Sequence, residues 1–470
     1  MRSLALLMFV AATLPMAFLR PIIGLLLWMM FSYLNPHRIT WGFAVSFPWV
    51  MLVALVTLVG LAMQARQRQM PPFKPLVVLM SMFLIWVAIG TLQAAEPTAA
   101  SKELTQFCKM MIMTFATLML VTDREKLHWV LWVIVASFGF WGFKGGLFTL
   151  LTGGNYHVMG PEHSFFTDNN AFALIMCMSL PLMRYVQTQL DQRWLKIGLW
   201  VVMGLTAVAI IGTYSRGGLL ALAVTGFMLI WKSRRRGALI LIAPLLVVGI
   251  GAFMPQQYFS RMDTINQYEQ DSSAVGRIES WKFATQVAVA HPLFGGGFDV
   301  WRSDSMWNQY GPPDAAHRAI HSIFFEVLGE QGFVGLGFFI SMLAFGYFGL
   351  ARIRKQARAR TDSEWLADLA SMLQVCLVAY AAGGAFLPLP YIDFFYQLLG
   401  LIAVMQVLVK QQPVASTETA GKQEQQSSKV RAPRRRQPRV DRPRPAGLSP
   451  SSRRIAKPGG VGGAQDLPPW

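Results

Sequence analysis

A single arginine lies between two apolar runs that are too close together for an ordinary loop. This residue, Arg216, occurs in TYSRGGLLAL (213–222), where a new helix is expected to begin directly after the arginine. A guanidinium beside a helix N-terminus favours a bound anion through charge and through free backbone amides. The alternative is an arginine that extends its side chain to the membrane surface.

A second arginine, Arg277, lies in SAVGRIESWKFATQVAVAHPLFGGGFDVW (273–301). The pattern predicts an amphipathic helix that starts near Val275 and ends before His291, followed by a flexible turn at 295–297. Arg277 falls in the first helical turn, where the helix dipole mildly disfavours a cation. It therefore fits either an anion site or a surface salt bridge. A glycine run without Lys-Ser/Thr is weak evidence for a phosphate cradle.

A histidine opens the apolar run HSIFFEVLGEQGFVGL (321–336). An imidazole near neutral pH can accept a proton from a hydroxyl, so His321 is a candidate catalytic base. A histidine that caps an interfacial helix is the alternative. His317, four residues earlier, is expected to share a helical face with it, although such a pair without carboxylates makes a poor metal site. Glu330 is expected to face away from His321.

Two lysines lie in or beside apolar runs, Lys109 and Lys144. Cations inside a membrane are costly and are usually paired or functional, although side chains that extend to the surface explain these two equally well. The loop before the next predicted span also contains polar residues, namely His163, Asp168 and 169–170. They either bind a polar ligand or cap the helix that follows.

The elements that position these residues are predicted to be membrane helices. Hydrophobic residues make up 54% of the 470 residues and charged residues 14%, a balance typical of a chain surrounded by lipid. We expect an all-α polytopic membrane protein with twelve or thirteen spans, because Arg20-Pro21 interrupts the first. The predicted spans are 4–34, 44–64, 76–94, 105–122, 128–150, 169–188, 196–213, 217–232, 237–254, 321–350, 365–386 and 392–409.

The loops between these spans predict the orientation of the chain. Lys and Arg are concentrated in 64–74, 123–126, 184–196, 232–236 and 351–360, and all five can be cytoplasmic at once. The loops 95–104, 151–168, 214–216, 255–320 and 387–391 then face outward. Residues 255–320 form the one long polar segment between spans. Polar groups gathered at one face favour chemistry at the outer interface over transport through the midplane.

The last sixty residues differ in composition from the rest. Residues 411–470 carry twelve Lys/Arg and four Asp/Glu, so they contribute +8 of the net charge of +18. They are rich in Pro, Arg, Ser and Gln and predict a disordered basic cytoplasmic tail. Contact with anionic lipid or a topological role is favoured over nucleic-acid binding. The domains are then 1–410, with 255–320 as a large helical loop within it, and the tail.

Three cysteines in apolar runs form no disulfide or metal pattern, and no motif indicates a metal, a nucleotide or another cofactor.

Taken together, these stretches resemble the O-antigen ligase and O-antigen polymerase superfamily of bacterial membrane glycosyltransferases. His321-Ser322, nine residues, Gly332, two residues and Gly335 are similar to its ligase motif. Arg216 with Leu220, and GRIESWKFATQVAVAHPLFGGGF, are similar to two further motifs. The resemblance covers about 70–410 and is greatest to the O-glycosylation ligases associated with exosortase systems.

The resemblance implies a donor, a glycan on undecaprenyl pyrophosphate, at the periplasmic face of the bacterial inner membrane. It implies that Arg216 and Arg277 bind the diphosphate and that His321 orients or deprotonates an acceptor hydroxyl, with inversion and without a metal. The acceptor is a lipid A core sugar, a protein or a growing polysaccharide. Lys109, Lys144, His317, Gly332 and Gly335 are candidate substrate-binding residues.

Two other functions stay open at this point. The first is a polymerase that joins repeat units, although the histidine motif favours a ligase. The second is a transporter or flippase of a lipid-linked sugar, which predicts deep polar residues and internal repeats.

Overall fold

The computed structural model describes residues 2–64, 72–233, 236–237, 240, 255–256, 272–313 and 316–413. Most of the predicted span 237–254, the start of the 255–320 segment and nearly all of the basic tail lie outside this part of the chain. The chain divides into two compact units, Met1–Ala415 and Ser416–Trp470, and everything below concerns the first.

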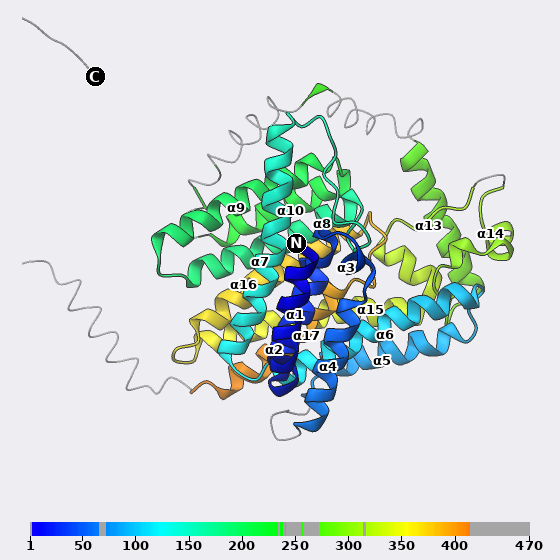
Figure 1. The fold of residues 1–470 in the computed structure, drawn as a ribbon. Helices are drawn as coiled ribbons and strands as arrows, with labels where there is room; N and C mark the ends of the chain where they lie inside the picture. The colour runs from blue at the N-terminus through cyan, green and yellow to red at the C-terminus, as the bar shows by residue number, and fades with distance from the viewer. Residues whose placement is uncertain are drawn as a thin grey trace, which may run out of the picture. The chain divides into compact units, whose positions relative to one another are not determined.

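The described secondary structure is helical. The main helices are α1 (Arg2–Leu19), α2 (Pro21–Tyr33), α4 (Trp49–Met63), α5 (Pro75–Thr91), α6 (Pro97–Leu120), α7 (Arg124–Leu151), α8 (Asn169–Gln189), α9 (Arg193–Gly212), α10 (Arg216–Lys232), α13 (Ser272–Ala290), α15 (Ile323–Arg358), α16 (Glu364–Gly384) and α17 (Asp393–Gln411). The short helices are η1 (Pro36–Ile39), α3 (Phe43–Ser46), η3 (Val300–Arg302) and α14 (Asp304–Tyr310). Figure 1 shows their arrangement.

The predicted class, an all-α polytopic membrane protein, is confirmed. Seven of the described helices are long and apolar enough to cross a membrane, namely α1, α7, α8, α9, α15, α16 and α17, and α2, α4 and α5 are shorter apolar helices. The stretch 4–34 is two helices, because Pro21 starts α2 directly after Arg20. The total of twelve or thirteen spans stays a prediction.

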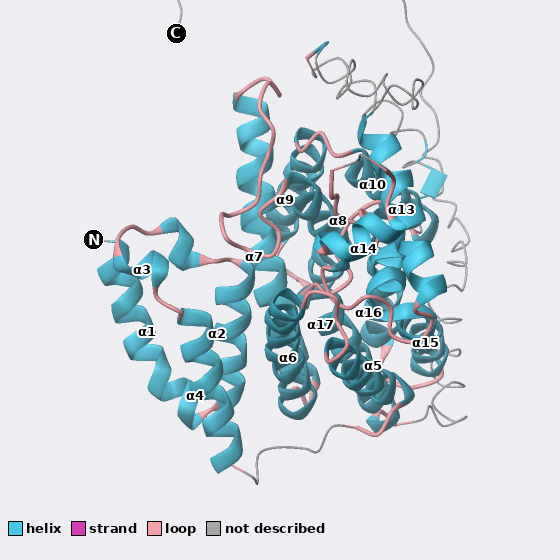
Figure 2. Cartoon of the chain, turned by 90° about the vertical axis from the view of Figure 1, so that its right-hand side faces the viewer, coloured by secondary structure: helices cyan, strands magenta, loops and turns pink. Residues whose placement is uncertain are grey.

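The helices pack through close backbone contacts typical of membrane bundles. α7 lies along α9, and α16 packs against α8, α10 and α15. At Gly146 of α7 a Cβ atom would lie 2.1 Å from the Leu205 carbonyl oxygen of α9, so only glycine allows this approach. Figure 2 shows α1, α2 and α4 as a group on one side of the bundle, with α6, α17, α5 and α15 following.

The basic segments meet at one end of the helices. Arg124 lies 5.0 Å from the centre of the Trp365 ring, joining the starts of α7 and α16. The Lys232 Nζ and Arg354 Nη1 atoms lie 3.1 Å and 3.5 Å from the Gln374 Oε1 atom. Three of the five loops that were predicted to share one side, 123–126, 232–236 and 351–360, therefore lie at one end of the bundle. Which side of the membrane they face is a separate proposal.

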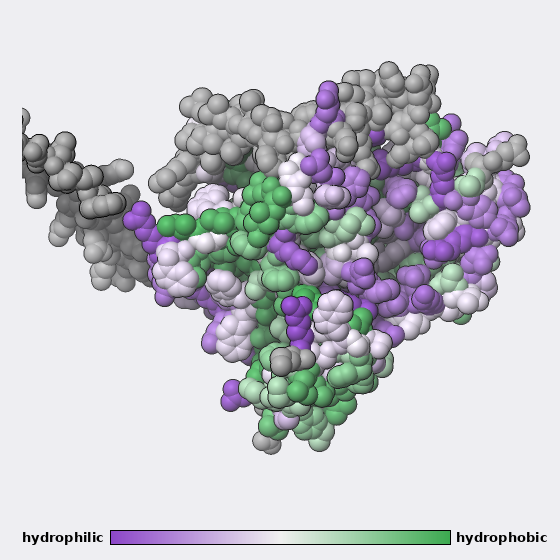
Figure 3. Space-filling model, turned by 45° about the horizontal axis from the view of Figure 1, so that its top comes forward, coloured by the Kyte–Doolittle hydropathy of each residue, from purple (hydrophilic) through white to green (hydrophobic). Residues whose placement is uncertain are grey.

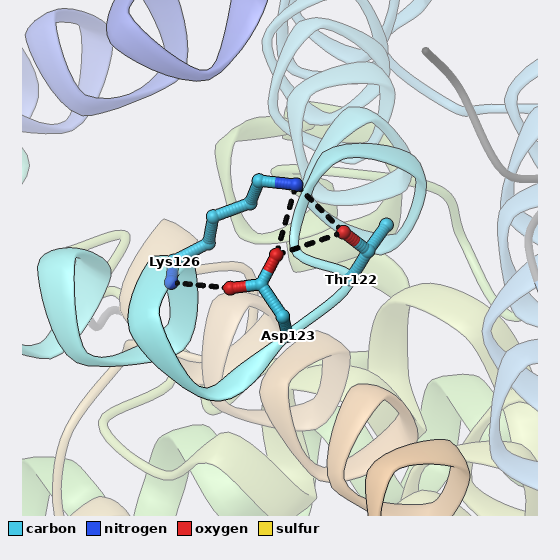
Figure 4. A network of polar contacts seen from close by, with 3 residues as sticks. All are labelled: Thr122, Asp123 and Lys126. Carbon is cyan, nitrogen blue, oxygen red and sulfur yellow. Dashed lines mark hydrogen bonds and ion pairs between the residues drawn. The ribbon is translucent and has the colours of Figure 1, made fainter. Parts of the chain in front are cut away.

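The start of α7 at this basic end is locally determined (Figure 4). Asp123 is the N-cap, and its Oδ1 atom accepts a hydrogen bond of 2.9 Å from the Lys126 amide. The Lys126 ammonium lies 3.0 Å from the other carboxylate oxygen and donates to the Thr122 hydroxyl at 2.7 Å. Burial opposes the Asp123 charge, but these bonds prevail and lower the pKa of its carboxyl. The cap fixes where α7 begins.

Hydrophobic and hydrophilic residues occupy different parts of the surface. Figure 3 shows hydrophobic residues in the lower part of the view and hydrophilic residues on the right, where Figure 1 places α13 and α14. On α4 the exposed side chains include Met51 and Leu55, with 49% and 54% of their surface accessible. Such a surface suits contact with lipid.

Candidate functional site

The site begins where the N-termini of α8 and α10 lie side by side. Asp168 caps α8, and its carboxylate accepts hydrogen bonds from the Asn170 and Ala171 amides at 2.9 Å and 3.1 Å. The Ser215 hydroxyl caps α10 by accepting a bond from the Gly218 amide. Ser215 also donates to the Asn170 side-chain oxygen at 2.7 Å, which joins the two termini. Two positive helix ends therefore meet at one place.

A strained turn holds Arg216 at this junction. Tyr214, two residues earlier, has a φ of +58°, a left-handed conformation that is uncommon for a residue with a side chain. Its hydroxyl donates to the Gly154 carbonyl, and its ring lies 4.5 Å from the His157 ring. The Asn169 side chain donates to the Thr213 carbonyl at 2.8 Å from the other side. The loop after α7 thus fixes the direction in which α10 starts.

Arg277 reaches the same region through α13. As predicted, this helix ends before His291, although it starts three residues before Val275. One turn after Arg277, the Trp281 ring stacks on Phe325 of α15 at 5.0 Å and lies 6.1 Å from Phe386. A Cβ atom added at Gly217 would lie 3.6 Å from Phe386, so the start of α10 borders the same aromatic group.

The loop that carries Arg277 has a hydrophobic core of its own. Buried side chains of α13, η3, α14 and the segment before α15 form a cluster separate from the main bundle core. The cluster contains Phe283, Ala284, Val287, Val300, Trp307 and Ile320. This core packs α13, which carries Arg277, against η3, α14 and the segment before α15.

His321 precedes α15, and two charged groups already described act on it. Arg277 and Asp168 are both close enough to act electrostatically on its half-buried imidazole. Burial lowers the pKa of His321 below 6.5, the Arg277 charge lowers it further, and the Asp168 carboxylate partly offsets them. The net result favours a neutral imidazole at pH 7, as a proton acceptor requires.

The predicted helical face shared by His317 and His321 is wrong. The described residues 316–322 are not helical, and α15 begins only at Ile323, after an extended Ser322 (φ −166°, ψ 125°). His317 instead lies against α14, with its Nε2 atom 3.6 Å from the Asp304 carboxylate and its ring 5.2 Å from Trp307. An irregular backbone removes the four-residue periodicity on which the prediction relied.

The predicted span 321–350 falls within α15, which is long and apolar enough to cross a membrane, but α15 is broken at Gly332. This residue has φ 68° and ψ −172°, a conformation accessible essentially to glycine alone. A Cβ atom there would lie 2.4 Å from the Leu293 carbonyl oxygen. Residues 323–331 are too short to cross a bilayer, since nine residues rise about 14 Å. The longer part of α15 therefore starts after the break.

The 292–297 segment supplies the hydrogen bonds that the break removes from α15. The Gly296 and Gly297 amides donate to the Gly329 and Glu330 carbonyls, each at 2.9 Å. The Trp86 indole donates to the Gln331 carbonyl at 3.2 Å. The Phe333 amide, beyond the break, donates to the Pro292 carbonyl at 2.9 Å. In the run Gly295–Gly297, two of the three amides therefore donate to α15 carbonyls and are not available to bind a phosphate.

Glu330 takes part in the same junction, a role that the sequence did not predict. Its Oε1 atom accepts a hydrogen bond of 2.8 Å from the Asp299 amide, and only 2% of its surface is accessible. Glu326, one turn earlier, and Tyr391 lie close to it. The sequence did contain a signal for this role, namely two glutamates four residues apart in an apolar run. Acidic residues inside a membrane are costly and usually have a function.

The remaining predicted substrate-binding residues are dispersed. Gly332 and Gly335 lie at the break, where a Cβ atom on Gly335 would lie 2.3 Å from the Gln331 Cβ atom. Lys144 is exposed on α7, with its ammonium 4.8 Å from the Trp141 ring. Lys109 is exposed on α6 and lines a large groove. The structure brings Arg216, Arg277 and His321 to one end of the bundle, whereas Lys144 and His317 have other neighbours.

This groove has a volume of about 800 Å³ and lies between α2, α4 and α6. Its polar lining residues include Arg38, Glu103, Lys109, His163 and Asp393. Its apolar lining residues include Trp28, Phe47, Met51, Leu55, Phe107, Ile112, Phe165 and Phe298. Several of the apolar side chains are exposed toward the lipid-facing surface. A groove lined by both polar and exposed apolar side chains suits an amphiphile that enters from the bilayer.

Two protein-family models match the regions that contain these residues. Residues 201–340, which contain Arg216, Arg277 and His321, match a family model. The family is described as O-Antigen ligase. This match supports the O-antigen ligase superfamily and a membrane enzyme that transfers glycans. Residues 1–190, which contain Asp168 and most of the groove, match a second model described as a family of unknown function (DUF5935). A comparison with curated proteins gives no match.

Proposed function

We propose that this protein is a membrane glycosyltransferase of the O-antigen ligase type, most similar to the exosortase-associated O-glycosylation ligases. It transfers a glycan from undecaprenyl pyrophosphate to a hydroxyl of lipid A core or protein, with inversion. The observation that carries the proposal is that Arg277 and Asp168 both act on a half-buried His321, while the α8 start capped by Asp168 adjoins the α10 start that bears Arg216.

The two arginines bind the diphosphate and stabilise the charge that develops on it as it leaves. Guanidinium groups form paired, charge-assisted hydrogen bonds to phosphate oxygens. Two adjoining helix N-termini add a positive field to the same place. Fixed donors directed at developing charge supply much of the catalysis in such reactions.

His321 accepts the proton of the acceptor hydroxyl. The acceptor oxygen forms a bond to the anomeric carbon, and the bond from that carbon to the diphosphate oxygen breaks, with its electron pair leaving on the diphosphate. The proton passes to the imidazole and then to solvent. Asp168 positions and stabilises the imidazolium during this step, because its carboxylate favours the charged form.

The groove lined by Lys109 holds the region where the lipid and polar parts of a substrate meet. Its exposed apolar side chains face hydrocarbon, while Lys109 and Arg38 suit a phosphate. Residues 1–410 form the transferase domain, with 255–320 as its large periplasmic loop and a basic cytoplasmic tail after it. The site then faces the periplasm from the bacterial inner membrane. This placement at one end of the bundle favours an enzyme over a flippase.

The direct test uses purified protein in detergent with a lipid-linked glycan and an acceptor. Product formed without ATP, and with a chelator present, is expected from the native protein and lost in His321→Ala. A ladder of products on the lipid carrier would instead indicate a polymerase. His291→Ala is the matched control, because that side chain is exposed and lies outside the proposed site. Full activity of His321→Ala and Arg216→Ala would overturn the mechanism.

Orientation is tested by labelling single cysteines in a background without Cys108, Cys177 and Cys376. Glu162→Cys lies in an exposed segment near the site, and Asp191→Cys lies in an exposed turn at the basic end. A membrane-impermeant thiol reagent applied to spheroplasts is expected to label Glu162→Cys alone. Labelling of Asp191→Cys alone would reverse the proposed topology.

A further inference from the structure

A small basic pocket lies at the end of the bundle away from His321. It has a volume of about 150 Å³ and is formed by α5, α15 and α17. Its lining residues are Lys74, Pro75, Leu76, Phe345, Gly349, Arg352, Ile353, Gln356, Gln406 and Lys410. Each of the three helices contributes one cation, and none of the described lining residues is acidic. The pocket is therefore strongly positive.

The position of Lys74 is not explained by helix stability. Lys74 is the N-cap of α5, where the helix dipole disfavours a cation, and no side chain among the described residues caps this terminus. Lys410, in the last turn of α17, does suit a helix dipole. The uncapped start of a 17-residue helix adds backbone donors to the cations. An anion in the pocket would pair with the cations and accept hydrogen bonds from the backbone amides at the start of α5.

Neutral hydrogen-bond donors and an apolar wall complete the pocket. A Cβ atom at Gly349 would lie 2.9 Å from the Gln406 Nε2 atom, so the glycine leaves room for that amide. Leu76 is buried in the wall, whereas 45% of the Phe345 surface is exposed along the lipid-facing part of α15. A ligand with a charged head and a hydrocarbon chain satisfies both surfaces, while free phosphate satisfies only the first.

We propose that this pocket binds the phosphate headgroup of an anionic membrane phospholipid. The acyl chains would lie along Phe345, in the leaflet opposite the transferase site, because the 17 residues of α5 rise about 26 Å between the two ends. Basic pockets between membrane helices are typical sites for such headgroups. The proposal is independent of the transferase activity and of the tail.

The test measures lipid retained by the full-length protein in native mass spectrometry. The protein is purified in detergent and mixed with dioleoylphosphatidylglycerol or dioleoylphosphatidylcholine. We expect preferential retention of one or two phosphatidylglycerol molecules, and about fivefold weaker retention for each cation removed. The variant Lys74→Gln/Arg352→Gln/Lys410→Gln is expected to lose the preference.

The matched control, Arg193→Gln/Lys355→Gln/Arg358→Gln, removes the same charge from exposed positions that do not line the pocket. It is expected to retain the preference. Equal loss in both triple variants would show diffuse charge attraction and overturn the proposal. Competition by millimolar inorganic phosphate, with no advantage for the lipid, would identify a free-phosphate site and also overturn it.

Discussion

The Gly297 amide donates a hydrogen bond of 2.9 Å to the Glu330 carbonyl, and this bond joins the two glycine-containing motifs of the chain. The motifs lie about thirty residues apart, yet each completes the hydrogen bonding of the other. The break in α15 is therefore stabilised by the loop that carries Arg277. A change at the junction is expected to alter the position of that arginine as well as local stability.

Replacing Gly332 tests whether the break is obligatory. Gly332→Ala places a Cβ atom in a conformation that costs about 1–3 kcal/mol and against the Leu293 carbonyl. We expect a lower melting temperature in detergent and reduced transfer activity. Gly337→Ala is the control, since a Cβ atom there meets nothing within 4 Å, and it is expected to be neutral or slightly stabilising. Equal effects of both variants would contradict this role of Gly332.

The hydrogen bond between Glu330 and the Asp299 amide predicts a difference between two substitutions. Glu330→Gln keeps an oxygen that can accept the bond, so a small change in unfolding free energy is expected. Glu330→Ala leaves the partly buried Asp299 amide without this acceptor, at a cost of about 1–3 kcal/mol. Thermal unfolding of both proteins measures the difference. A more stable Ala variant than Gln variant would show that the hydrogen bond is unimportant.

The pH dependence of transfer is expected to follow the His321 imidazole. Burial, together with the Arg277 charge, lowers its pKa, so the base stays neutral and active somewhat below pH 6.5. Asp168→Asn keeps a side chain that caps α8 but removes the charge that raises this pKa. The acidic limb of the kcat/KM profile should therefore move to lower pH. A shift to higher pH would refute the assigned pair.

The arginines are expected to act on the leaving diphosphate. Arg216→Lys keeps a positive charge but loses the paired donors of the guanidinium, and a fall in kcat of about 10²–10³ is expected. Arg277→Lys should behave similarly. Arg193→Lys, at an exposed position at the basic end, serves as the control and should leave kcat unchanged. Steady-state assays that vary the donor separate kcat from KM.

The groove predicts an effect on substrate binding and not on the chemical step. Lys109→Gln should raise the KM for the lipid-linked donor several-fold, with little change in kcat, because Lys109 lines the groove. Lys102→Gln removes an exposed lysine from the same helix outside the groove and is the matched control. A raised KM in both variants would point to general surface charge.

Local signals in the sequence predicted several elements correctly. The first apolar run is interrupted at Arg20-Pro21, α10 begins at Arg216, within one residue of the expected start, and α13 ends before His291. Each depends on residues within a few positions of the boundary, so spacing and residue type are sufficient. The alternation of basic loops likewise predicted that the loops 123–126, 232–236 and 351–360 lie at one end.

Long-range contacts and unusual backbone conformations could not be predicted from the local sequence. The apolar run after His321 was predicted as one helix, because hydropathy does not distinguish a glycine in a helix from one at a break. The action of Asp168 on His321 joins residues far apart in the chain, and nothing in their local sequence indicates it. The bond between Glu330 and the Asp299 amide is of the same kind.

The contact between Asn170 and Ser215 crosses from one matched family region to the other. Asp168, which acts on His321, also belongs to the region of unknown function. The proposed site therefore draws on both regions, and we expect the two to be inherited as a pair. In a chimera that takes residues 1–190 from a relative, that region would need an acid at the position of Asp168 and an asparagine at the position of Asn170.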